Sequence, residues 1–180
     1  VFSEANNYKV LKAAQELMHD NIAQAILLGN KEDIQWVIKE NNLDLNGVTI
    51  IDPRSKEEEY NREQYANIFY KKRQRKGLNK EEALDLMYNP NYYGCMMVES
   101  GEADAFLSGF SSKYADVIRP AIQIAGTNNP QKHIAGMYVI QTKKGPFFFA
   151  DTTINIQPSA QTLVDTTLLT AKAVERFNIV

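Results

Sequence analysis

Short apolar runs alternate with longer amphipathic segments along the first two thirds of the chain. The apolar runs predict buried strands at residues 23–28, 48–51 and 103–107, and residues 1–2 resemble the end of a further strand. Between them, apolar residues at helical spacing predict helices at 7–18, 30–40, 56–76, 79–87, 90–100 and 112–125. This order of elements predicts an α/β fold, a three-layer αβα sandwich with a mostly parallel sheet.

Several of these helices have recognisable start signals. Ser55 with Glu58, and Asn79 with Glu82, have the spacing of a capping box, in which each side chain accepts a hydrogen bond from the other residue's backbone. Asn89 stands before a proline that would take the first helical position.

The pattern changes after the polar segment 126–132, whose Gly, Asn and Pro content is typical of a linker. Beyond it, the sequence predicts two strands at 133–141 and 146–150, joined by a turn, and a helix at 158–177. We therefore expect a first domain at 1–130, lacking its first strand, and the beginning of a second at 131–180. A stretch of about 50 residues is marginal for an independent core, so the second domain is expected to be incomplete.

Composition excludes several classes of protein. The net charge of −2 gives no general attraction to nucleic acid or acidic membranes, and no apolar run reaches the roughly 18 residues that span a bilayer. Cys95 is the single cysteine, which excludes an internal disulfide and fits a reducing, cytoplasmic compartment. His19 and His133 lack metal-ligand neighbours, so surface roles are expected for both and no metal site is predicted.

The strongest candidate for chemistry is the loop Ser108–Ser112, which stands between a predicted strand and a predicted helix. Ligands of α/β sheets bind at the carboxyl ends of strands, and free N–H groups at a helix start suit phosphate. Arg119, one to two turns into that helix, could add a bidentate contact to an anion. The alternative is that serine and glycine only shape the turn. Pro120 lies either inside this helix or in its first turn.

Two further features have both a binding and a structural interpretation. The basic run 71–76 fits a solvated helix end, where cations favour the helix dipole, or a site for a phosphate-rich cofactor. Asp151 follows an apolar strand, where a carboxylate is either a site residue or the cap of a turn.

Three segments together resemble the phosphate acetyl/butyryltransferase family. They are the helix and Gly-Glu-Ala-Asp segment at 92–104, the Ser-Gly…Asp-x-x-Arg-Pro-Ala-x-Gln-Ile segment at 108–124, and the Phe-Ala-Asp…Pro segment at 149–158. Arg73 resembles an arginine of the family's long helix. The family exchanges acetyl groups between coenzyme A and phosphate. The resemblance implies a cleft between two α/β domains, the second of them isocitrate/isopropylmalate dehydrogenase-like, and a homodimer or higher oligomer.

The resemblance also implies which residues take part. Ligand-binding roles toward coenzyme A or phosphate are implied for Arg73, Ser108, Gly109, Ser111, Ser112, Lys113, Arg119 and Asp151. Lys113 and Tyr114 depart from the small hydroxyl residues usual in acetyltransferases at these positions. The family's catalytic serine, arginine and aspartate would lie beyond residue 180, so no catalytic residue is expected within the chain.

Residues 43–53 and 165–179 resemble one branch of the family most, the acetyltransferase-like domain of NADP-dependent malic enzymes. The leading hypothesis is therefore a regulatory module of a malic enzyme that binds acetyl-CoA or coenzyme A. The chain itself would hold no cofactor, and NADP and a divalent metal would belong to an attached malic enzyme domain. One alternative is an active phosphate acetyltransferase that forms acetyl phosphate from acetyl-CoA and phosphate, and another is a structural dimerisation module.

Overall fold

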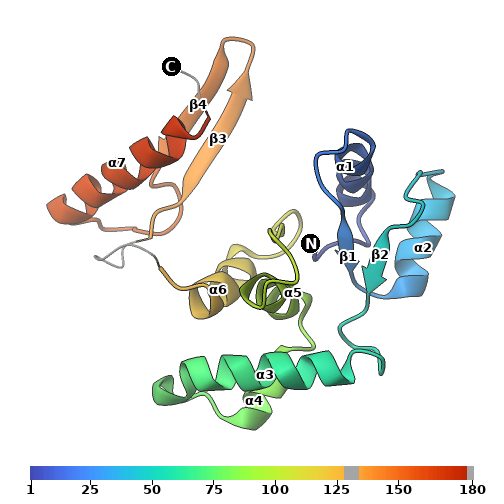
Figure 1. Cartoon of the computed structure of the whole chain (residues 1–180). Coiled ribbons are helices and arrows are strands. Elements are labelled where there is room, and N and C mark those ends of the chain that lie inside the picture. Colours follow the sequence, from blue (N-terminus) through green and yellow to red (C-terminus); the bar gives the residue numbers. More distant parts are fainter. Residues whose placement is uncertain (128–133, 178–180) are drawn as a thin grey trace. The chain divides into compact units, whose positions relative to one another are not determined.

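The computed structural model describes residues 1–127 and 134–177, and the chain forms two compact units, Val1–Gly126 and Thr127–Val180 (Figure 1). The predicted domain boundary near residue 130 lies outside the described residues. Unit 1 contains α1 (Tyr8–His19), β1 (Ile26–Leu28), α2 (Lys31–Glu40), β2 (Thr49–Ile51), α3 (Glu59–Arg73), the short 3-10 helix η1 (Gln74–Lys76), α4 (Lys80–Leu86), α5 (Pro90–Glu99) and α6 (Tyr114–Ile124). Unit 2 contains β3 (Met137–Thr142), β4 (Gly145–Ala150) and α7 (Ala160–Glu175).

The strands of unit 1 form a small parallel sheet. β1 pairs with β2, and Phe2 forms parallel bridges with both Leu27 and Leu107, so the order is Leu107, Phe2, β1, β2. Of the strand predicted at 103–107, only Leu107 is bridged, because the segment that pairs with it is short. The observed class is a mixed α/β fold with a sheet smaller than expected.

Helices cover both faces of this sheet. Successive strand residues point to opposite faces, so Leu27 and Leu28 enter different hydrophobic clusters. Leu27 packs in one cluster with residues of α1 and α2, and Leu28 packs in the other with residues of α3, α4, α5 and α6. The sheet is therefore the common wall of two cores.

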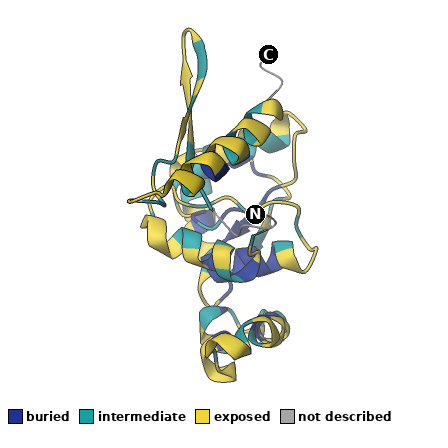
Figure 2. Cartoon of the chain, turned by 90° about the vertical axis from the view of Figure 1, so that its left-hand side faces the viewer, coloured by how far each residue is buried: buried dark blue, intermediate teal, exposed yellow. Residues whose placement is uncertain are grey.

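α5 is the most buried helix of unit 1, with every residue from 91 to 97 buried (Figure 2). Gly94 allows its close approach to the rest of the core, because a Cβ there would lie 2.4 Å from the ring of Phe106.

The helix starts confirm most of the predicted caps. Asn79 forms a capping box with Glu82, and the Asn89 side chain accepts from the Asn91 N–H with Pro90 in the first turn. The capping box predicted at 55–58 is wrong, since α3 begins at Glu59 without a side-chain cap. Glu58 instead accepts hydrogen bonds from the Tyr93 hydroxyl and the Asn61 amide, because the phenol of the buried Tyr93 requires a partner of its own.

Unit 2 is an antiparallel hairpin with one helix. The predicted hairpin is confirmed: β3 and β4 pair from Met137 opposite Ala150 to Thr142 opposite Gly145, and α7 packs against β4. Most residues of α7 remain exposed (Figure 2). The residues described in this unit, 134–177, form no parallel sheet, so a dehydrogenase-like second domain stays a prediction.

Candidate anion-binding site

The predicted loop 108–112 directly follows Leu107, which forms a parallel bridge with Phe2. Because the two segments run parallel, Ser3 and Ser108 leave the sheet at the same edge. The Ser3 hydroxyl donates to the Ser108 hydroxyl at 2.8 Å, and Ser108 donates to the Asn91 side-chain oxygen at 2.8 Å. The Asn91 amide donates in turn to the Asp116 carbonyl of α6 at 3.2 Å. The loop is thus tied to residues 1–4, α5 and α6.

The loop holds an anion, and that anion is the carboxylate of Glu4. Six donors surround it at 2.6–2.9 Å: the backbone N–H groups of residues 109–112 and the hydroxyls of Ser111 and Ser112. Burial raises the pKa of Glu4, but the donors outweigh burial and lower the pKa from 4.5 to about 2. The N–H groups of the loop converge on a carboxylate within the protein, and binding of a ligand at this loop stays a prediction.

The loop leads directly into α6. Lys113 is the N-cap residue, is exposed, and forms no side-chain cap hydrogen bond. Pro120 lies inside the helix and is buried, which decides between the two positions that the sequence left open. Arg119 precedes it and is exposed.

Arg73 and Arg119 act on the same phenol. The Tyr92 hydroxyl donates to the Gln123 side-chain oxygen at 2.8 Å. Burial raises the pKa of Tyr92, while the positive charges of Arg119 and Arg73 oppose that rise. α3, α5 and α6 pack against one another, so two arginines 46 positions apart in sequence serve one region. Neither guanidinium forms an ion pair or hydrogen bond with any residue that the structure describes.

A polar cavity of about 360 Å³ lies at the same edge of the sheet, and its lining carries more negative than positive charge. Its lining includes Asn30, Asp33, Asp52 and Arg54, two carboxylates against one guanidinium. The first N–H groups of α2 are also occupied there, since Asn30 accepts from Glu32 and Asp33. The two carboxylates make this cavity unfavourable for an anion.

Asp151, in unit 2, is held mostly by donors two to four positions after it in sequence. Its carboxylate accepts from the backbone N–H groups of Gly136, Thr153, Ile154 and Asn155 and from the Asn155 side chain. Burial raises the pKa of Asp151, and these donors outweigh it and lower the pKa well below its ordinary value. The arrangement supports the turn-capping interpretation. A role in ligand binding stays a prediction.

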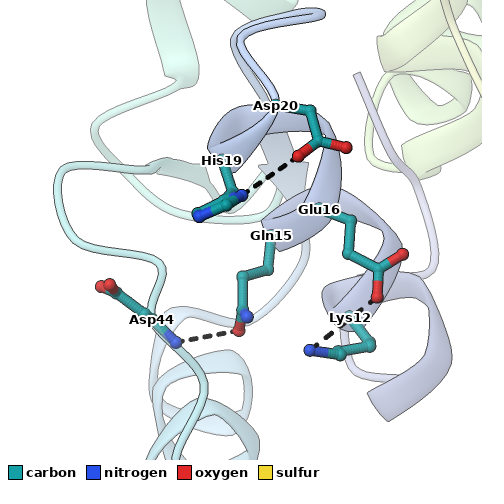
Figure 3. A network of polar contacts seen from close by, with 6 residues as sticks. All are labelled: Lys12, Gln15, Glu16, His19, Asp20 and Asp44. Carbon is teal, nitrogen blue, oxygen red and sulfur yellow. Dashed lines mark hydrogen bonds and ion pairs between the residues drawn. The ribbon is translucent and has the colours of Figure 1, made fainter.

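Other candidate side chains have structural or surface positions. Burial raises the pKa of the Cys95 thiol to about 11, which makes it a poor nucleophile. His19 lies on the surface, 3.0 Å from Asp20, in an exposed network that includes Lys12, Glu16 and the contact of Gln15 with the Asp44 N–H (Figure 3). His133 lies outside the described residues. In the two described ranges, no three His, Cys, Asp or Glu side chains are placed to hold a metal ion.

Comparison with known proteins decides the family. The model of the phosphate acetyl/butaryl transferase family matches residues 1–180. The chain belongs to this family. A phosphate acetyltransferase of Bacillus subtilis is 34% identical over 179 residues, which are 99% of this chain and 54% of the relative. A phosphate acetyltransferase of Thermoanaerobacterium thermosaccharolyticum is 35% identical over 169 residues, which are 91% of this chain and 50% of that relative.

A solved structure shows the same fold. The crystal structure of a phosphotransacetylase from Streptococcus pyogenes matches with a TM-score of 0.84 and 28% identity, over 99% of this chain and 54% of that chain. The chain spans about half the length of the relatives named here.

These findings correct the leading hypothesis from the sequence. The relatives that match nearly the whole chain are phosphate acetyltransferases, so the interpretation as a malic enzyme module, with NADP and oxidoreductase chemistry, is wrong. Among the helices of the described ranges, none is long and apolar enough to cross a membrane.

Proposed function

We propose that the chain is part of a phosphate acetyltransferase that exchanges an acetyl group between coenzyme A and phosphate. The observation that carries this proposal is the pair of guanidinium groups, Arg73 and Arg119, which share the surroundings of Tyr92 and have no partner among the described residues. Two arginines suit a phosphate group because each presents a planar set of donors. Family membership supplies the reaction type.

The substrates would be acetyl-CoA with phosphate in one direction and coenzyme A with acetyl phosphate in the other. In the second direction, the thiol gives up its proton to solvent or to the departing phosphate, its sulfur forms a bond to the acetyl carbon, and the bond from that carbon to the phosphate oxygen breaks. Arg73 and Arg119 would hold the phosphate or a phosphate group of coenzyme A, and Lys113 at the start of α6 would add a positive charge nearby. Ser108, Gly109, Ser111 and Ser112 would form the wall beside them. We assign no general base on this chain.

The proposal extends to the setting of the enzyme. The finer fold is a three-layer αβα domain followed by a second α/β domain, and the protein is a homodimer or higher homo-oligomer, as the family resemblance implies. Its location is the cytoplasm, which the single cysteine fits. Light scattering on the complete gene product, run behind size-exclusion chromatography, measures the oligomeric state, and a monomer would contradict the dimer.

Arg119→Ala tests the proposal. The complete gene product is expected to form acetyl phosphate from acetyl-CoA and phosphate, and the variant is expected to lose roughly 100-fold or more in kcat/KM, because a charge-assisted contact to a phosphate is removed. Arg75→Ala is the matched control, since Arg75 is an exposed arginine two positions from Arg73, in η1. Equal losses in the two variants would show that general positive charge, and not this pair, serves the substrate.

A further inference from the structure

Six hydrogen-bond donors converge on the carboxylate of Glu4. Four consecutive backbone N–H groups, from residues 109 to 112, converge on its two oxygens together with two hydroxyls. This arrangement is that of an anion-binding nest, formed by successive N–H groups that point into one concavity. We call residues 109–112 the nest. Only 9% of the Glu4 residue surface is exposed, so its carboxylate replaces solvent there.

The nest stands immediately before the start of α6. Lys113, the N-cap, offers no side-chain acceptor to this end of the helix, and Glu4 supplies a negative charge to it from more than 100 positions away. Arg119 lies on the helix that the nest begins. The place where α6 starts therefore depends on a residue beside the first bridge of the sheet.

We propose that Glu4 is a positioning residue, which fills the nest, fixes the start of α6 and so sets the position of Arg119 for its anionic substrate. This inference rests on the proposed function for the role of Arg119. It also assigns the nest's N–H groups to Glu4 and leaves the substrate's phosphate to Arg73 and Arg119. Loss of the carboxylate would free the nest for a small anion from solution.

Glu4→Ala with added acetate tests the occupancy of the nest. The substitution removes two carbons and two oxygens, which are the heavy atoms of acetate, so acetate alone is the probe. Without acetate, the Tm of the complete gene product is expected to fall by roughly 5 °C or more, because buried N–H groups lose their acceptor. Acetate at about ten times its Kd should then raise the Tm by roughly 3 to 6 °C, while sodium chloride of equal ionic strength does not.

Glu16→Ala is the matched control, because Glu16 is an exposed glutamate in α1 of the same unit (Figure 3). Its Tm should change by about 1 °C at most and show no specific response to acetate. An unchanged Tm in Glu4→Ala, or a response to acetate no larger than that of the control, would overturn the claim that Glu4 fills the nest. If Glu4→Ala does not fold, Ser111→Ala with Ser112→Ala removes two of the six donors. This milder variant should lower the Tm, and an unchanged Tm would overturn the proposal.

The positioning role has its own measurement. In Glu4→Ala the KM for phosphate is expected to rise at least roughly tenfold while kcat stays within about threefold, since Arg119 is displaced but not removed. A folded variant with the KM of the wild type would refute positioning. If the wild type has no activity, the proposed function fails. Calorimetric Kd values for inorganic phosphate in wild type and Glu4→Ala then decide the inference, and equal values refute it.

Discussion

Two carboxylates of this chain, Glu4 in unit 1 and Asp151 in unit 2, are surrounded by hydrogen-bond donors in a similar way but through different parts of the chain. The partners of Asp151 lie 2 to 4 positions after it, apart from Gly136 at 15. The partners of Glu4 lie 105 to 108 positions away. A short-range set can form partly in the unfolded chain, whereas the set around Glu4 exists only once the sheet has formed. The folded state should therefore depend more on Glu4 than on Asp151.

Glu4→Gln gives the largest expected effect on stability. A glutamine keeps the shape of the side chain but turns an N–H₂ group toward N–H donors, and a change in pKa from 4.5 to about 2 corresponds to about 3 kcal/mol. Because the pKa of Glu4 is lower in the folded protein, the unfolded chain binds the proton first as the pH falls. The contribution of Glu4 is complete above about pH 4.5 and is lost as the pH falls toward 2.

Urea unfolding of wild type and Glu4→Gln across this pH range checks the prediction. The two proteins should differ by about 3 kcal/mol near neutral pH and approach each other as Glu4 is protonated. If the difference in free energy of unfolding stays constant down to pH 2.5, the effect of the substitution does not come from the charge of Glu4.

Gly136→Ala tests the other carboxylate. A Cβ at this position would lie 2.3 Å from the Thr153 hydroxyl and 3.2 Å from the Asp151 carboxylate, so the contact with the Gly136 N–H must shift. We expect a loss of about 2 kcal/mol, confined to unit 2. Hydrogen exchange measured by peptide should increase in 134–177 and stay unchanged in the nest. A change in the nest would show that the two carboxylates are coupled.

Ser111→Ala has the smallest expected effect. It removes one hydroxyl donor of Glu4 and leaves the Ser111 N–H in place, so we expect a loss of about 1 kcal/mol. Chemical denaturation of Ser111→Ala alone and combined with Glu4→Gln measures the coupling between the two side chains. Fully additive losses would mean that this hydroxyl does not serve Glu4.

The same contrast explains how much the sequence could predict. The caps at Asn79 and Asn89 involve residues two or three positions apart, and both were predicted correctly. The turn-capping interpretation of Asp151 could likewise be proposed from the sequence, because most of its partners lie two to four positions after it. Glu58 was misassigned because the Tyr93 hydroxyl, 35 positions away, takes its carboxylate.

Glu4 gave no local signal. Nothing near it in sequence marks a binding partner, and only the pairing of Phe2 with Leu107 brings it to the nest. The sequence proposed the loop as a site for a bound anion, but that the Glu4 carboxylate accepts from its N–H groups depends on the order of the strands. Arg119 was proposed from its place on the predicted helix and Arg73 from the family resemblance, but their common neighbour Tyr92 became evident only from the packing of α3, α5 and α6.

A crystal structure of the complete protein with bound phosphate tests the central claim most directly. It should show phosphate on Arg73 and Arg119, with the Glu4 carboxylate still hydrogen-bonded to the N–H groups of residues 109–112. Phosphate on those N–H groups, with Glu4 displaced from them, would contradict the account.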